Sequence, residues 1–121
     1  FTNSLVREFT ETMNNSLSNS QRKKSQNLKS IEVDVTTIDF ILNGSEECPN
    51  FIKIDVEGAE LKVLQGATKT LPKVDSLMVE ISRDHKEIYE LMYDFNFKAI
   101  SKANAAISKN EYPGGNIFFV R

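Results

Sequence analysis

The sequence predicts an α/β fold with a mostly parallel sheet, an antiparallel last strand and helices on both faces. Three observations support this prediction. Short β-forming segments alternate with segments of helical periodicity along the chain. Residues 77–81 form an almost continuous apolar run, which is typical of a strand covered on both faces. No helical segment separates the last two strands, so we expect these two to pair antiparallel.

The N-terminal quarter of the chain differs from the remainder in composition. Residues 1–30 are rich in Ser, Asn, Thr, Gln and Lys and poor in residues that build a core. We therefore interpret them as a polar loop or arm. The basic run at residues 22–24 is interpreted as part of a solvated loop. Residues 31–121 carry the pattern of a folded domain.

The first part of that domain is predicted to run strand, helix, strand, helix. Residues 31–35 alternate apolar and acidic side chains, as in a strand with one buried face. Thr36 or Thr37 can cap a short helix, which Gly44 ends in a left-handed conformation. Residues 51–56 form the next strand, and a tight turn at Gly58 leads into a helix over about residues 59–71.

The second part continues the alternation. The strand at residues 77–81 precedes Asp84 and Glu87, whose spacing resembles a capping box. The apolar spacing that follows predicts a helix, which Asn96 can end in a left-handed conformation. Two further strands are predicted over residues 97–101 and 116–120.

The bulk composition excludes several classes of protein. A net charge of −2 argues against a general binder of nucleic acid or of membrane surfaces. The single cysteine, Cys48, excludes an internal disulfide framework, so we expect a reduced, cytoplasmic location. No apolar run reaches the roughly 18 residues of a membrane-spanning helix. There is no His/Cys cluster of the kind that binds zinc, and we expect no bound metal.

Carboxylates gather where the strand at residues 51–56 turns into its helix. Asp55, Glu57 and Glu60 crowd this turn, and Glu80 near the end of the next strand is a weaker candidate. Ligands of open α/β sheets bind outside the carboxyl ends of the strands. Such carboxylates can accept a proton, hydrogen-bond a ribose or amine, or bind a hard cation. The structural alternative is helix capping and pairing with nearby lysines, and it is strongest for Glu60, in the first helical turn.

A family resemblance centres on the same turn. The stretch Ile52-Lys-Ile-Asp-Val-Glu-Gly-Ala-Glu-Leu61, followed by Val63-Leu-Gln-Gly-Ala67, resembles the most recognisable motif of the FkbM-type methyltransferases. Residues 35–39, 79–81 and 116–120 resemble further segments of that family and occur in the family's order. The resemblance covers about residues 31–121. One departure is Asn96-Phe97, where the family usually has Gly-Tyr; Asn tolerates the same backbone conformation.

The resemblance implies an enzyme that transfers a methyl group from S-adenosylmethionine, mostly to hydroxyl groups, on a Rossmann-like sheet. It implies that Asp55, Glu57 and Glu60 serve the acceptor, a small molecule or sugar. The first strand and Gly-rich loop that normally hold the cofactor have no match here. We therefore expect this chain to be the C-terminal half of the domain and to be inactive alone.

Two rival interpretations stay open. The chain could be a degenerate or truncated family member that acts as a non-catalytic binding or assembly module, which the absent Gly-rich loop favours. An unrelated receiver-like domain would need an acidic pair after its first strand, and none is visible. In either family interpretation the strand at residues 51–56 lacks a neighbour, so we expect the missing half or another copy to pair with its edge.

Overall fold

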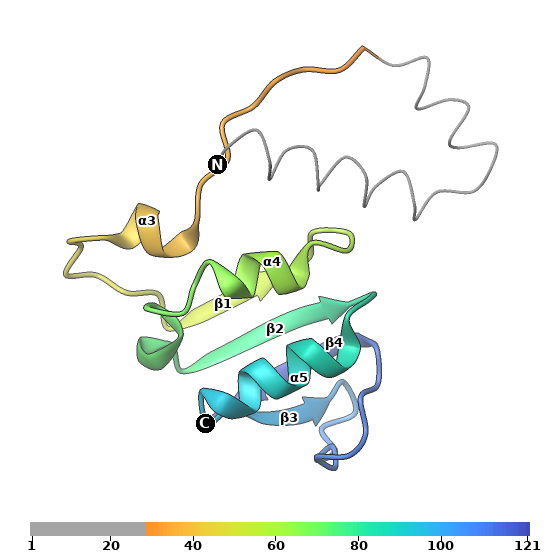
Figure 1. Ribbon diagram of the computed structural model, residues 1–121. Helices are drawn as coiled ribbons and strands as arrows, with labels where there is room; N and C mark the ends of the chain where they lie inside the picture. Colours follow the sequence, from red (N-terminus) through yellow and green to blue (C-terminus); the bar gives the residue numbers. More distant parts are fainter. Residues whose placement is uncertain (1–28) are drawn as a thin grey trace. The chain divides into compact units, whose positions relative to one another are not determined.

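The computed structural model describes residues 29–121 (Figure 1). The chain divides into two units, Phe1–Thr36 and Thr37–Arg121. The elements of the second unit are α3 (Ile38–Leu42), β1 (Phe51–Ile54), α4 (Glu60–Gln65), the 3-10 helix η1 (Leu71–Lys73), β2 (Ser76–Ile81), α5 (His85–Asp94), β3 (Lys98–Ser101) and β4 (Gly115–Val120).

The described part of the first unit contains no strand. Residues 29–36 have no regular secondary structure, so the strand expected over residues 31–35 is wrong. Ile31 and Val33 are 81% and 56% exposed. An alternating pattern produces a strand only where a neighbouring strand can share its backbone hydrogen bonds, and no described strand pairs with this segment. The polar arm expected over residues 1–30 lies almost entirely outside the described residues.

The four described strands form one sheet in the order β1-β2-β4-β3. β1 pairs with β2 in parallel, whereas β4 pairs antiparallel with both β2 and β3. The expectation of a mostly parallel sheet is therefore wrong for these strands, while the antiparallel pairing of the last two strands is confirmed. The reason is the place of β4. It lies between β2 and β3, which both point the same way as β1, so both of its pairings are antiparallel.

Helices α4 and α5 lie on the same face of this sheet (Figure 1). Two crossovers of the same hand, β1 to β2 and β2 to β3, advance across the sheet in one direction and place their helices on one side. The prediction of helices on both faces is therefore wrong for the described residues. The prediction that the strand at residues 77–81 is covered on both faces is wrong for them as well. Met78 and Phe118 are only half-buried on the opposite face. The core contains Ile54, Leu64, Ala67, Leu71, Val74, Leu77, Val79, Ile81, Ile88, Tyr89, Met92, Phe97, Ala99, Ile117 and Phe119.

The short helix α3 begins and ends as its sequence indicates. The Thr37 hydroxyl accepts the backbone N–H of Phe40 at 3.0 Å and so caps the helix. Gly44 follows the helix with φ of 76°, in the left-handed region where glycine carries no steric penalty. Both features confirm the predictions for this segment.

Helix α4 is shorter than expected, and the carboxylate of the distant Asp39 binds the segment that follows it. Asp39 Oδ2 accepts the N–H of Lys69 at 2.9 Å, and Oδ1 accepts the N–H and the hydroxyl of Thr70 at 2.9 and 2.7 Å. In a continuing helix these N–H groups would donate to carbonyls one turn back. The chain instead leaves the α-helix after Gln65 and turns into η1.

Helix α5 starts differently from the prediction and ends as predicted. Asp84 occupies the N-cap position but has φ of 53° and makes no side-chain cap bond, so the capping box is wrong. Its carboxylate Oδ2 lies 3.6 Å from Arg83 Nε instead. Asn96 follows the helix with φ of 67°, as predicted. Within residues 29–121, no helix has the length and apolar character needed to cross a membrane.

Candidate functional site

A strained turn carries the acidic residues from β1 into α4. Asp55 follows β1 directly and is exposed to solvent. Glu57 has φ of 51° and Gly58 has φ of 99°. A left-handed conformation is uncommon for residues other than glycine, and such outliers cluster at functional sites. The turn places the Asp55 and Glu57 side chains at the carboxyl end of a parallel strand, as the sequence predicts.

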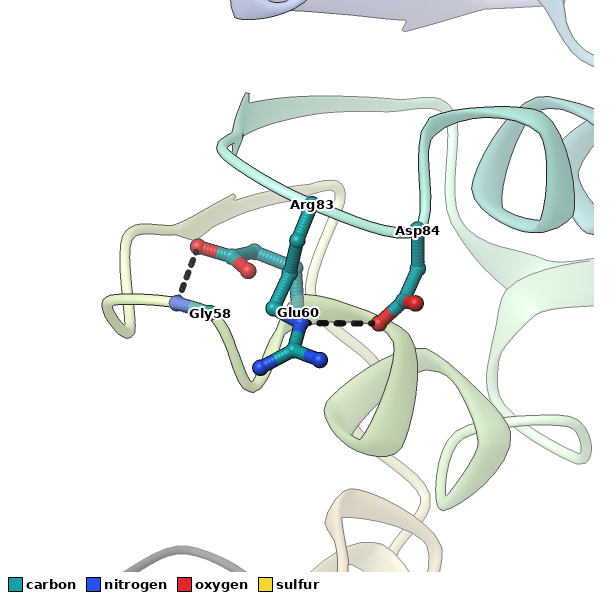
Figure 2. A network of polar contacts seen from close by, with 4 residues as sticks. All are labelled: Gly58, Glu60, Arg83 and Asp84. Carbon is teal, nitrogen blue, oxygen red and sulfur yellow. Dashed lines mark hydrogen bonds and ion pairs between the residues drawn. The ribbon is translucent and has the colours of Figure 1, made fainter. Parts of the chain in front are cut away.

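Glu60 lies beneath this turn. Its side chain is 1% exposed, although it belongs to the first turn of α4. Figure 2 shows the side chain directed back toward Gly58, whose N–H donates to Glu60 Oε1 at 3.2 Å. Glu60 Oε2 has no hydrogen-bond partner among the described residues. Glu60 therefore fixes the conformation of the turn from inside, and this is the kind of bond that the capping interpretation predicts.

The end of β2 adds a further carboxyl group beside Asp55. Ile54 lies opposite Val79 in the parallel pair, so Asp55 and Glu80 are the next residues of the two strands. A hydrogen bond with the Asp55 side chain raises the pKa of Glu80 above its ordinary value. The negative charge of Asp55, burial and the charge of Glu57 act in the same direction. The Glu80 carboxyl group therefore keeps its proton to a higher pH than an isolated glutamate does.

The described residues favour proton and hydrogen-bond chemistry at this corner. An exposed carboxylate such as that of Asp55 can accept a proton from a bound hydroxyl group. The nearby Arg83 forms its ion pair with Asp84, with a separation of 3.6 Å (Figure 2). Within residues 29–121, no group of three or more His, Cys, Asp or Glu side chains has a geometry that could hold a metal ion.

The sequence predicted Asp55 and Glu57 as residues of this corner but indicated Glu80 only weakly. Asp55, Glu57 and Glu80 come together at the carboxyl ends of β1 and β2, and Glu60 is buried below them. Glu80 stood out only as an acidic residue near a strand end. Its contact with Asp55 depends on the parallel register, which the local sequence does not specify.

A hollow lies at the opposite end of the sheet. It has a volume of about 320 Å³ and is lined by residues before β1, such as Asp39 and Cys48, and residues before β2, such as Lys69 and Lys73. These residues precede the parallel strands, whereas ligands of open α/β sheets bind beyond the carboxyl ends. The Asp39 carboxylate is already engaged by the backbone. We therefore place the candidate site at the acidic corner.

Comparisons with known proteins identify the family of the chain. Residues 3–99 match the family model described as the methyltransferase FkbM domain. The chain is 35% identical over 83 residues to the hexuronic acid methyltransferase AglP of Haloferax volcanii. That match covers 66% of this chain and 33% of AglP, so the chain spans about a third of the length of this curated relative. No solved structure matches the chain.

Proposed function

This chain belongs to the FkbM methyltransferase family, and from that premise we propose that the intact protein transfers a methyl group from S-adenosylmethionine to a hydroxyl group of a small molecule or sugar. The observation that carries the proposal is the group of carboxyl side chains from Asp55, Glu57 and Glu80 at the carboxyl ends of two parallel strands. A sugar acceptor is supported by the relative AglP, whose name states that it methylates a hexuronic acid.

Each carboxylate of the turn has a distinct part in this proposal. Asp55 is exposed directly after β1 and accepts the proton of the acceptor hydroxyl. Glu57 is exposed in the turn and orients the acceptor by hydrogen bonds. Glu60 does not reach the acceptor, because it is buried. It positions the turn through its bond to the N–H of Gly58.

The described residues do not form a cradle for the cofactor. When bound, S-adenosylmethionine supplies an electrophilic methyl group. Its amino-acid carboxylate needs free backbone N–H groups or a complementary positive charge. The Gly58 N–H is already occupied by Glu60, and the carboxylates of Asp55 and Glu57 would repel an anionic group. We therefore assign cofactor binding to parts of the intact protein outside residues 29–121, and we expect this chain alone to be inactive.

The free edge of the sheet offers a place for such a part to pair. Among the described strands, β1 has β2 as its only neighbour, and Phe51 on β1 is 50% exposed. An unpaired edge strand presents a row of N–H and C=O groups to other chains or segments. We propose that another segment of the intact protein, or a second copy, pairs with β1. Analytical ultracentrifugation of this chain tests the second option, because pairing of copies would give dimers.

Calorimetric titration of S-adenosylmethionine into this chain and into the intact protein tests the function. Heat of binding from the intact protein but not from the chain is the expected result. Absence of binding to both would overturn methyl transfer and favour a non-catalytic binding module. In the intact protein we expect Asp55→Asn to lower the methylation rate by about 10²–10⁴-fold. Asp75→Asn is the matched control, because Asp75 is exposed just before β2, at the opposite end.

A further inference from the structure

The turn that ends α3 exposes an asparagine followed by a glycine. Asn43 and Gly44 follow the helix directly and are both exposed to solvent (Figure 1). Gly44 has φ of 76°, and a Cβ atom built on it would meet no atom within 4 Å, so the space around this residue is open. Both residues line the hollow that lies at the opposite end of the sheet from the acidic corner.

An asparagine before a glycine can lose ammonia without an enzyme. The backbone nitrogen of Gly44 attacks the Cγ atom of Asn43. A bond from this nitrogen to Cγ forms, the Cγ–Nδ2 bond breaks, and the Gly44 amide proton leaves with the side-chain nitrogen as ammonia. The product is a cyclic succinimide. Water then opens the ring at either carbonyl and gives aspartate or isoaspartate, so the reaction consumes only water and releases ammonia.

The Gly44 N–H takes no part in the hydrogen bonds that hold this turn. Those bonds run from the N–H of Asn43 to the Phe40 carbonyl at 3.3 Å and from the N–H of Ser45 to the Leu42 carbonyl at 3.0 Å. Among residues 29–121, no group accepts the Gly44 N–H. With ψ of 124° at Asn43, ring closure requires rotation about its Cα–C bond. Glycine has no Cβ atom to hinder this rotation.

Other exposed asparagines lack this combination. Asn104 is followed by Ala105, whose N–H donates to Ser101 Oγ at 3.2 Å. Asn110 is followed by Glu111, whose N–H donates to a carbonyl of its own turn at 3.0 Å. At both sites the hydrogen bond has to break before the nitrogen can attack, and the following residue has a Cβ atom. The same chain therefore contains matched sites that should react more slowly.

We propose that Asn43 is a site of spontaneous deamidation and that its product changes the end of α3. Isoaspartate adds a methylene group to the main chain between the two hydrogen bonds of the turn, so it loosens the bond from Ser45 to Leu42. Either product also adds a carboxylate to a hollow that Lys69 and Lys73 line. Neither step depends on methyl transfer.

Mass spectrometry of the full chain, aged in mildly alkaline buffer and then digested, tests the modification. The peptide with Asn43 should gain the mass that replacement of a side-chain NH₂ by OH brings. We expect this gain to be at least about fivefold faster than at Asn104, which is the factor for freeing one hydrogen-bonded amide. Asn43→Gln, which would have to close a larger ring, should show no gain. Equal rates at Asn43 and Asn104, or no gain at Asn43, overturn the proposal.

Amide hydrogen exchange at Ser45 tests the effect on α3. The aged chain should exchange this N–H at least about twofold faster than the aged Asn43→Gln variant, because isoaspartate weakens its bond to the Leu42 carbonyl. Asn43→Asp adds the charge without lengthening the main chain, so its exchange should stay within about twofold of the fresh chain. Equal exchange in the aged chain and the Asn43→Gln variant refutes the effect on α3. Exchange in Asn43→Asp as fast as in the aged chain refutes the longer main chain as its cause.

Discussion

Replacing Arg121 by methionine removes the side chain that ties the end of β4 to two other elements. Arg121 Nε donates to the carbonyl of Val74, just after η1, at 3.0 Å, and Nη2 donates to the carbonyl of Leu71, its first residue, at 2.6 Å. Its Nη1 donates to the carbonyl of Phe95, just after α5, at 2.8 Å. The guanidinium carbon lies 4.2 Å from the centre of the Phe97 ring. Methionine keeps most of the apolar stem and removes all of these donors.

The size of the effect follows from these contacts. A hydrogen bond from a charged donor contributes about 1.5–3 kcal/mol when its acceptor is shielded from water. The bonds to Val74 and Leu71 are partly buried, whereas the bond to Phe95 is exposed, so water can replace it. The contact with Phe97 adds about 0.5–1 kcal/mol. After allowance for the side-chain entropy that methionine regains, we expect Arg121→Met to lower the free energy of unfolding by about 3 kcal/mol.

Urea unfolding followed by circular dichroism at 222 nm measures this loss. The matched control is Arg83→Met. Among residues 29–121, Arg83 makes an exposed ion pair with Asp84, and its loss should change stability by less than about 0.5 kcal/mol. Arg121→Lys keeps the charge but not the three-way geometry, and it should fall between wild type and Arg121→Met. Equal losses for Arg83→Met and Arg121→Met would refute the reasoning, as would a loss below about 1 kcal/mol for the latter.

Three further substitutions test hydrogen bonds and packing elsewhere in the fold. Asp39→Asn should lower stability by about 1–3 kcal/mol at neutral pH. Burial works to raise the pKa of Asp39, but its hydrogen bonds outweigh burial and hold the pKa below 3.8. The stabilisation by the Asp39 carboxylate is therefore fully present above pH 3.8 and is lost as the pH falls through the lowered pKa. A loss for the variant that is equally large at low pH would contradict this reasoning. Gly66→Ala would place a Cβ atom 2.9 Å from Thr37 Cγ2 and should cost about 1–3 kcal/mol in a urea titration. Thr37→Ser removes that methyl group but keeps the Thr37 Cβ, which would lie 3.0 Å away, so it should relieve only part of the cost; fully additive losses would count against the contact. Burial, with a neighbouring tyrosine, raises the pKa of Tyr89 to about 12, and its hydroxyl donates to the Pro113 carbonyl at 2.7 Å. Tyr89→Phe should therefore cost about 1 kcal/mol and remove the last-ionising phenol from the ultraviolet pH titration, and an unchanged titration would be inconsistent with this assignment.

Local patterns were sufficient for the strand-turn-helix that carries the acidic residues. Ile52 and Ile54 alternate with polar neighbours, and Gly58 permits the turn, so the position of Asp55 at a strand end could be predicted from a few residues. The cap at Thr37 and the left-handed residue after α3 were predictable for the same reason. These features depend on hydrogen bonds and sterics within a few residues of each other.

Features that depend on distant partners could not be predicted in the same way. The alternating residues 31–35 suggested a strand, but a strand needs a neighbour, and none of the described strands provides one. The segment after α4 is bound by Asp39, which lies 30 residues before the Lys69 whose N–H it accepts. The capping box predicted at Asp84 does not form. Asp84 has a left-handed backbone, and its side chain makes no hydrogen bond to the first amides of α5.

By itself the sequence determined the alternation of helices and strands, the acidic turn at Asp55 and the family to which the chain belongs. Only the tertiary structure decided that β4 enters the sheet between β2 and β3 and that α4 and α5 share one face. It also decided that Glu80 meets Asp55 on one side and Asn116 on the other. The physical reason is that strand order and register are set by contacts between segments far apart in the chain, on which local propensities carry no information.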